Sequence, residues 1–195
     1  MNKIILASGS PRRKQLLELA EISFEVIVCH TDEIYPPGLS PSNVAIHIAH
    51  NKAETVQRNL KDNTQLSIII GADTIVVLGD NIIGKPTDRE DAIRILSLLS
   101  GKTHQVITGV CILSATEKIV FAEETSVTFH PLTVGQIEYY VEHYKPYDKA
   151  GAYAIQEWIG AIGIQSIKGD FYNVMGLPVS RVVGELDKLR RVEVV

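Results

Sequence analysis

Apolar runs alternate with amphipathic stretches along this chain. The runs are short and rich in β-branched residues, which is typical of buried strands. They predict strands at 4–7, 24–29, 66–78, 105–113, 119–129 and 161–167. Within the longest run, the segment 71–74 (Gly-Ala-Asp-Thr) interrupts the apolar sequence and predicts a break between two strands.

The amphipathic stretches carry apolar residues at helical spacing and begin at recognisable start signals. Ser10-Pro11 and Ser40-Pro41 place a capping serine before a proline that suits the first helical position. Two segments have the pattern of a capping box, 87–90 and 133–136, and a closing helix is predicted over 177–189. Strands that alternate with helices predict an α/β fold with a mixed twisted sheet. We expect a single domain, residues 1–195, with two lobes around a central cleft.

Composition narrows the class of protein. The chain has 195 residues, of which 45% are hydrophobic and 22% charged, as in soluble globular proteins. Its formal net charge of -4 argues against general binding to nucleic acid, which needs a broad basic surface. Cys29 and Cys111 form no CxxC motif, and no apolar run has the length of a signal peptide or a membrane span. We therefore expect a cytoplasmic protein without nucleic-acid or membrane partners.

The segment Ser8-Gly9-Ser10-Pro11-Arg12-Arg13 joins the first predicted strand to the first predicted helix. The amides of the first helical turn and the positive helix end favour an anion, and two guanidinium groups lie beside them. We expect a polyanion site here, most readily for a triphosphate, with Ser8, Ser10, Arg12 and Arg13 as binding residues. The alternative is an ordinary capped helix with two solvated arginines.

Asp73 lies in an otherwise apolar stretch, where an unpaired carboxylate costs on the order of several kcal/mol. It therefore needs a cation, a metal or a strand end that opens into a cleft. The alternative is a turn aspartate that accepts hydrogen bonds from nearby backbone amides. Gly71 beside it suits either a close backbone approach or a break in the strand.

Three further charged residues belong to the same hypothesis. Lys52 falls on the helical stripe that should face the core, so its ammonium either reaches the cleft or extends to solvent. Lys85 follows a predicted strand in a turn, from which it can reach the same cleft. Glu33 lies in a loop broken by prolines; alone it is typical of a solvated acid, but with Asp73 it forms a carboxylate pair for Mg²⁺ or Mn²⁺.

Small residues surround one lysine and one glutamine in the segment 149–156 (Lys-Ala-Gly-Ala-Tyr-Ala-Ile-Gln), which indicates a tight pocket wall. The Gln156 amide offers a donor and an acceptor, which can pair with the adjacent C=O and N–H groups of uracil or thymine. The alternative is a structural glutamine that satisfies backbone groups.

Together, six segments closely resemble the Maf family of nucleotide pyrophosphatases. They are SGSPRR (8–13), GADT (71–74), KP (85–86), GKTH (101–104), KAGAYAIQ (149–156) and GLP (176–178), in the family's order over nearly the whole chain. The resemblance implies a two-lobed α/β fold shared with the inosine triphosphate pyrophosphatases, a divalent metal cation and a homodimer. It also implies hydrolysis between the α and β phosphates of a nucleoside triphosphate, which releases the monophosphate and pyrophosphate.

The resemblance also assigns roles to single residues. Asp73 matches the family's proposed general base, and Arg12, Thr74 and Gln156 match positions tied to base choice. In the branch that acts on 7-methyl-GTP, glutamine and glutamate stand at the positions of Thr74 and Gln156. The chain therefore resembles the dTTP/UTP branch, with Tyr153-Ala154 in place of the commoner Tyr-Gly as a small departure.

A mechanism follows from these charges. We expect four cations to hold the phosphates and to offset the charge on the departing pyrophosphate: Arg12, Arg13, Lys52 and Lys85. Lys149 is a further predicted substrate-binding residue. Asp73 accepts the proton of the attacking water, and a metal on Asp73 and Glu33 lowers the pKa of that water. A water between Asp73 and the metal reconciles the two roles of this one aspartate.

We expect hydrolysis of dTTP and UTP, and of modified pyrimidine nucleotides as well, which predicts a house-cleaning role. The family's link to septum formation keeps a second hypothesis open, a nucleotide-binding regulator of cell division without significant hydrolysis. Such a regulator needs the cations but has no use for Asp73 and a metal-binding acid, so these residues favour the enzyme. A Rossmann-type cofactor enzyme is a third hypothesis, against which the lack of a glycine fingerprint argues.

Overall fold

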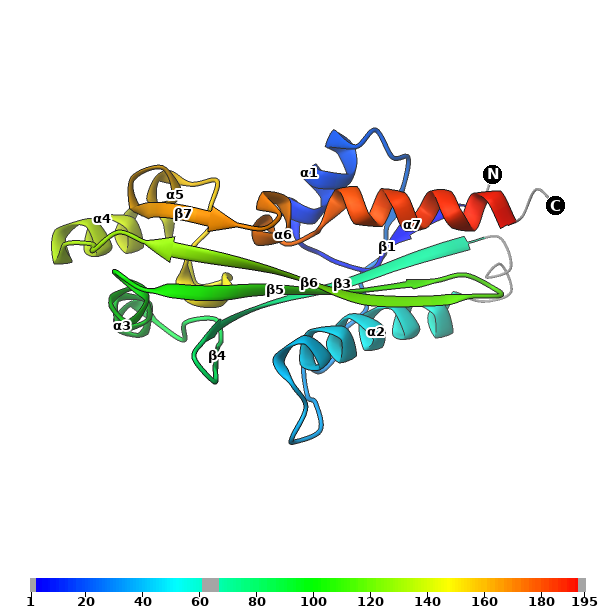
Figure 1. Ribbon diagram of the computed structural model, residues 1–195. Helices are drawn as coiled ribbons and strands as arrows, with labels where there is room; N and C mark the ends of the chain where they lie inside the picture. The colour runs from blue at the N-terminus through cyan, green and yellow to red at the C-terminus, as the bar shows by residue number, and fades with distance from the viewer. Residues whose placement is uncertain (1–2, 61–66, 193–195) are drawn as a thin grey trace. The chain divides into compact units, whose positions relative to one another are not determined.

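The computed structural model describes residues 3–60 and 67–192. The chain divides into two compact units, and most of their elements are labelled in Figure 1. Unit 1 contains residues 1–73, 108–123 and 176–195, and unit 2 contains residues 74–107 and 124–175. Three strands have residues in both units: β3 (Ser67–Leu78), β5 (Thr103–Leu113) and β6 (Lys118–Phe129). That residues 1–195 form one domain around a cleft stays a prediction.

The sheet is mixed, as the sequence predicts. Its strand order is β2-β1-β3-β5-β6-β7, and β4 (Asn81–Ile83) pairs with β3. β1 (Lys3–Leu6) pairs in parallel with both β2 (Glu25–Val26) and β3. β3 and β4 are antiparallel, and so are β6 and β7 (Ile164–Lys168). The prediction of an α/β fold with a mixed sheet is confirmed.

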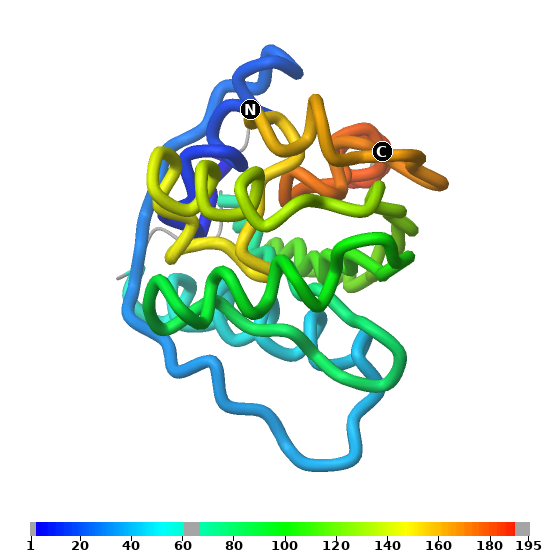
Figure 2. Tube along the Cα trace, turned by 90° about the vertical axis from the view of Figure 1, so that its left-hand side faces the viewer, coloured from blue at the N-terminus to red at the C-terminus, as the bar shows by residue number. Residues whose placement is uncertain are grey.

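Unit 1 packs helices against the parallel strands. Its helices are α1 (Pro11–Leu19), α2 (Pro41–Asn59) and α7 (Val179–Val192). A long loop, drawn in blue in Figure 2, leads from β2 to α2, which begins where the Ser40 hydroxyl accepts a hydrogen bond from the Asn43 amide. Ile5 and Ile69 of the strands pack with Ala49 and Ala53 of α2 in one apolar cluster.

Strand β3 is continuous through residues 71–74, so the predicted break is wrong. The glycine serves a close approach instead: a Cβ on Gly71 would lie 2.2 Å from the Ala49 carbonyl oxygen and 2.9 Å from the Ala53 Cβ of α2. Helix and strand approach each other where neither carries a larger side chain. Asp73 therefore stands on a strand, two residues beyond this contact, and Leu66, the predicted first residue of the run, lies outside the described residues.

Unit 2 has its own apolar core. Its helices are α3 (Arg89–Leu99), α4 (Val134–Tyr144), α5 (Trp158–Gly163) and α6 (Phe171–Met175), with a short 3₁₀ turn η2 (Ala150–Ala152). Leu96 and Leu99 of α3, Tyr140 of α4 and Phe129 of β6 are wholly buried in one cluster. The capping box predicted at 133–136 is confirmed, because the Thr133 hydroxyl and the Gln136 side chain each bond the other's backbone amide.

Several predicted starts differ from those of the structure, and two of them have a clear physical reason. The N-cap of α3 is Asp88, one residue later than predicted, and its carboxylate accepts from the Asp91 amide at 2.8 Å. A carboxylate interacts better with the positive start of a helix than the Thr87 hydroxyl does. The strand predicted over 161–167 begins only at Ile164, because 158–163 form α5, with Ile159 and Gly163 buried four residues apart on one face. Among the described residues, no helix is both long and apolar enough to cross a membrane.

Candidate functional site

Lys52 stands between two carboxylates in unit 1. Its ammonium donates to Asp73 Oδ1 at 2.6 Å and to Glu33 Oε1 at 2.9 Å. Helix α2 supplies the lysine, strand β3 the aspartate and the loop after β2 the glutamate. The Asp73 side chain is 11% exposed and the Glu33 side chain 46%, so these charges extend from the interior of the unit to solvent. The cation that Asp73 requires is Lys52, and the alternative of a turn aspartate is wrong.

Arg13 is buried in the same unit. Its Nε donates to the Gly176 carbonyl oxygen at 2.7 Å, and its Nη1 donates to the Ser8 hydroxyl at 2.9 Å. Burial lowers the pKa of the Arg13 guanidinium below its ordinary value, while the negative charge of Asp73 acts in the opposite direction. Arg13 therefore lies within the electrostatic reach of the Lys52–Asp73 pair, and it also ties the start of α1 to the segment before α7.

The start of α1 differs in detail from the expectation. Ser10 is the N-cap and Pro11 the first helical residue, but the Ser10 side chain makes no capping hydrogen bond. The Ser10 amide instead donates to the Ser8 hydroxyl at 3.3 Å. Arg12 is only half-buried, whereas Arg13 is buried, so the structure does not treat the two arginines as an equivalent pair.

In unit 2, a backbone contact joins two of the predicted segments. The Gly151 amide donates to the Gly84 carbonyl oxygen at 3.1 Å, which holds the loop of the exposed Lys85 against the turn that follows Lys149. Gly151 adopts φ 71°, and a Cβ there would lie 2.9 Å from Val76 Cγ2. This position therefore requires glycine.

Lys149 is buried and faces two carboxylates. Its ammonium lies 2.7 Å from Asp148 Oδ1 and 3.6 Å from Glu157 Oε1. Asp148 is mostly exposed, whereas the Glu157 side chain is 23% exposed. Glu157 was not among the predicted site residues. No local pattern in the sequence singles it out.

Gln156 is exposed on a tight turn. The Glu157 amide donates to the Ala154 carbonyl oxygen at 3.1 Å, which closes a turn with Ile155 and Gln156 at its centre. Ile155 is buried, so the turn is anchored by one central residue and presents the other. Thr74, the remaining predicted specificity residue, is half-buried on β3 next to Asp73 in the sequence.

A buried polar pair supports the segment before this turn. His104 Nε2 and the Tyr153 hydroxyl lie 2.7 Å apart, and both rings contact Phe129. Burial lowers the pKa of His104 to about 4 and raises the pKa of Tyr153. The pair is therefore neutral at pH 7.

The carboxylates of unit 1 suit a divalent metal. Mg²⁺ is commonly bound by one or two carboxylates together with substrate phosphates. Asp73 and Glu33 offer two such oxygens, and both already converge on one cation, the Lys52 ammonium. In the described part of the chain, no group of three or more His, Cys, Asp and Glu residues could hold a metal alone.

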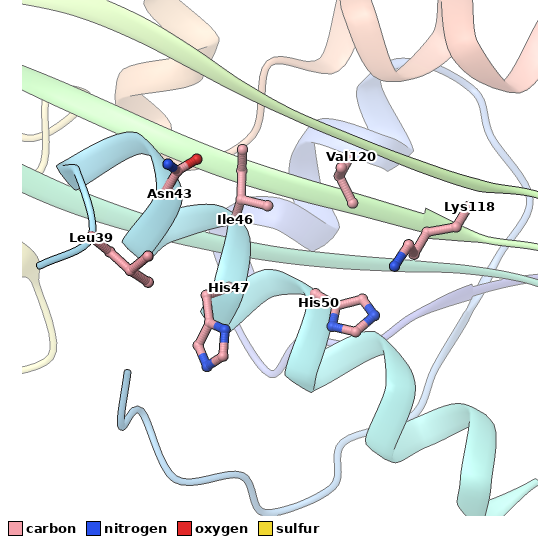
Figure 3. A pocket seen from close by; sticks show the side chains of 7 residues that line it. All are labelled: Leu39, Asn43, Ile46, His47, His50, Lys118 and Val120. Carbon is pink, nitrogen blue, oxygen red and sulfur yellow. The ribbon is translucent and has the colours of Figure 1, made fainter. Parts of the chain in front are cut away.

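A surface groove lies elsewhere on unit 1. Figure 3 shows Asn43, Ile46, His47 and His50 of α2 beside Lys118 and Val120 of β6. His47 is engaged by the Asn51 side chain at 3.0 Å. None of the predicted site residues lines this groove.

Comparison with known proteins places the chain. The model of the family described as Maf-like protein matches residues 3–189. The chain belongs to the Maf family. The resemblance inferred from the six sequence segments is thereby confirmed, and these segments lie within the matched range.

Curated Maf relatives cover almost the whole chain. One from Parabacteroides distasonis, named dTTP/UTP pyrophosphatase, is 48% identical over 94% of this chain and 94% of its own length. Relatives of the same name from Porphyromonas gingivalis and Bacillus cereus are each 50% identical, covering 94% and 95% of this chain and 92% and 95% of their own lengths. The solved structure of the Staphylococcus aureus Ham1 protein is 15% identical, with a TM-score of 0.45 over 65% of this chain and 71% of that chain.

Proposed function

We propose that this Maf protein hydrolyses dTTP and UTP to the monophosphate and pyrophosphate, as a house-cleaning enzyme of nucleotide metabolism. The names of relatives at about half identity support the substrate and the reaction. The observation that carries the proposal is the nearly buried Asp73 carboxylate, 2.6 Å from the Lys52 ammonium. A nucleotide binder has no use for this acid, whereas a hydrolase needs a proton acceptor.

Cations of unit 1 bind the phosphates in this proposal. An ammonium has three N–H donors, and two carboxylate bonds leave the third N–H of Lys52 for a phosphate oxygen. The uncapped start of α1 adds backbone amides and a positive helix end. Arg12 and Arg13 supply guanidinium charge beside it, and Lys85 and Lys149 stay predicted as further substrate-binding residues. These charges offset the charge that builds on the departing pyrophosphate.

Asp73 accepts the proton of the attacking water. Its strand position and its bond to Lys52 hold the carboxylate in one place, which is the requirement for a general base. Asp73 and Glu33 would also hold the divalent metal, Mg²⁺ or Mn²⁺, which would supply positive charge and lower the pKa of a water. Before substrate binds, the positive charge of Lys52 offsets the repulsion between the two carboxylates.

Gln156 reads the base in this proposal. The exposed amide on the 154–157 turn can donate to a C=O group and accept from the N–H group beside it, an edge that uracil and thymine share. Thr74 and Arg12 complete base choice, on the family resemblance.

A panel of triphosphates tests the reaction. The purified protein is incubated with dTTP, UTP, CTP and GTP, with Mg²⁺, with Mn²⁺ and with EDTA, and the products are separated by chromatography. We expect UMP and dTMP with pyrophosphate, only when a divalent metal is present. Release of UDP and orthophosphate would contradict cleavage between the α and β phosphates. Full activity in EDTA would show that the reaction needs no divalent metal.

A homodimer in the cytoplasm completes the proposal. The dimer rests on the family resemblance, and light scattering coupled to size-exclusion chromatography tests it. The expectation of a reducing compartment rests on the two cysteines, which form no CxxC motif.

A further inference from the structure

Selectivity for uracil requires a fixed amide. Cytosine carries an amino group where uracil has a C=O, so a glutamine that turns its amide over by 180° serves cytosine equally well. Within the described residues, no hydrogen bond holds the Gln156 side chain itself. The backbone turn that carries Gln156 sets the position and direction from which this side chain extends, and therefore which amide orientation can meet a bound base.

The hydroxyl of Tyr140 touches this turn at two places. It accepts a hydrogen bond from the Ala154 amide at 3.1 Å, and it donates to Oε2 of Glu157. Ala154 and Glu157 are the first and last residues of the turn, and they are also joined to each other by the bond that closes it. One buried hydroxyl thus connects both ends of the turn to helix α4.

Tyr140 is itself rigidly held. It is fully buried in the core of unit 2, and its ring stacks on Tyr144 with centroids 5.0 Å apart. The other oxygen of Glu157 faces the Lys149 ammonium at 3.6 Å, so the carboxylate is oriented from two sides. Just before the turn, the Tyr153 hydroxyl bonds His104 at 2.7 Å.

We propose that Tyr140 is a positioning residue, which acts with Glu157 to orient the Gln156 turn and so to set selectivity for uracil and thymine over cytosine. This inference rests on the proposed function, because it assigns a support to the base-reading residue named there. Tyr140 touches no substrate in this scheme. It acts only through the backbone of 154–157.

Removal of single groups tests the scheme. Tyr140→Phe keeps the ring but removes the hydroxyl, and Glu157→Ala removes its acceptor from a position that is partly exposed. Both are expected to lower the ratio of kcat/KM for UTP to that for CTP about tenfold, the effect of about one lost hydrogen bond. Glu157→Gln retains an oxygen that accepts from Tyr140 and is expected to keep the ratio. Tyr144→Phe, on the same helix, is the matched control and is expected to keep it too.

The readout separates positioning from mere stability. A purely structural loss lowers the melting temperature and reduces turnover of UTP and CTP alike, without changing their ratio. A wild-type ratio in Tyr140→Phe, or an equal fall in Glu157→Gln and Glu157→Ala, overturns the proposal. Calorimetric binding of UTP and CTP to the same variants measures the ratio without hydrolysis. A wild-type protein that binds but does not hydrolyse UTP therefore refutes the proposed function, while the binding ratio still decides the role of Tyr140.

Discussion

Lys52, Asp73 and Glu33 depend on one another. An isolated buried charge is costly, and each member of this trio supplies the opposite charge or the hydrogen bond that another needs. Lys52 is also the only member with hydrogen-bond donors, so it is the residue through which the carboxylates and a phosphate are brought close. Changes at this site therefore affect charge balance and chemistry together.

Asp73→Asn separates these effects. The amide oxygen still accepts from Lys52, so we expect a folded protein with an unchanged circular-dichroism spectrum. Without a proton acceptor, kcat for dTTP should fall by at least about 100-fold. Asp80→Asn, the same change at an exposed position in the turn after β3, is the control and should retain full activity. Wild-type turnover by Asp73→Asn would remove the aspartate from catalysis.

Gln156→Glu tests the base-reading residue. A carboxylate cannot donate to the C=O group of uracil, so selectivity for UTP and dTTP should weaken by about tenfold or more in kcat/KM. Competition assays with paired triphosphates measure this directly. Gln165→Glu makes the same charge change at an exposed position of β7 and should leave the profile intact. An unchanged profile in Gln156→Glu would exclude the residue from the base pocket.

At this scale, sequence reasoning works where a residue conflicts with its surroundings. Asp73 in an apolar run required a cation, a metal or a strand end at a cleft, and the structure supplies a cation, Lys52. Glu157 escaped prediction because a glutamate at the edge of a loop is ordinary until its partners are known. Its partners are Lys149 and Tyr140, and both lie well before it in the sequence.

At the scale of elements, the contact between α2 and β3 places the trio. The helix supplies Lys52 and the strand supplies Asp73, so their separation is set by how closely the two elements pack. Gly71 permits that packing because no Cβ stands against Ala49 and Ala53. The distance between the charges is thus a property of a helix–strand interface.

Gly71→Ala should therefore damage both stability and activity. The added methyl group would lie 2.2 Å from the Ala49 carbonyl oxygen, so α2 must move away. Urea denaturation should show a loss of about 1–3 kcal/mol in the free energy of unfolding, and turnover should fall because Lys52 moves with the helix. Gly184→Ala on α7 has open space around the new methyl group and should be neutral or slightly stabilising. Equal stability of the two variants would contradict this account.

The boundaries of elements show what local pattern can and cannot predict. The capping box at Thr133 was predictable because both of its bonds lie within four residues. The continuity of β3 was not, because glycine and aspartate within a strand resemble a turn until the helix above them is known. A short apolar run such as 161–167 has no periodicity that separates helix from strand.

At the scale of the molecule, unit 2 contains a group that links folding to pH. His104 is buried, and its pKa is lowered to about 4 from an ordinary 6.5. The unfolded chain therefore binds a proton more readily than the folded one. Stability from this group is complete above about pH 6.5 and is lost as the pH falls toward 4, by about 3 kcal/mol in total.

Denaturation at pH 7 and pH 4 measures this loss. His104→Gln cannot gain the charge, so its free energy of unfolding should fall less over the same interval than that of the wild-type protein. His143→Gln, at an exposed position of α4, should follow the wild-type dependence. If His104→Gln shows the same fall as the wild type, other groups cause the acid sensitivity.

The fold class and the family were predictable at this scale because each rests on many weak signals along the chain. Alternating runs indicated an α/β fold, and six segments in order indicated the Maf family. The sequence predicts two lobes but not where the boundaries between the two units fall along the chain. Strands β3, β5 and β6 have residues in both, and alternation of side chains along a strand carries no mark of such a boundary.

Helix α2 packs against the sheet at two glycines, since Gly109 of β5 contacts Ala45 as closely as Gly71 of β3 contacts Ala49. These two close contacts should determine which substitutions the protein tolerates. Methyl-sized additions at these glycines and alanines, which have no role in the proposed chemistry, should therefore inactivate the enzyme. In a screen of random variants, some inactivating substitutions should then fall at these glycines and alanines, where the harm comes from the atoms that the substitution adds.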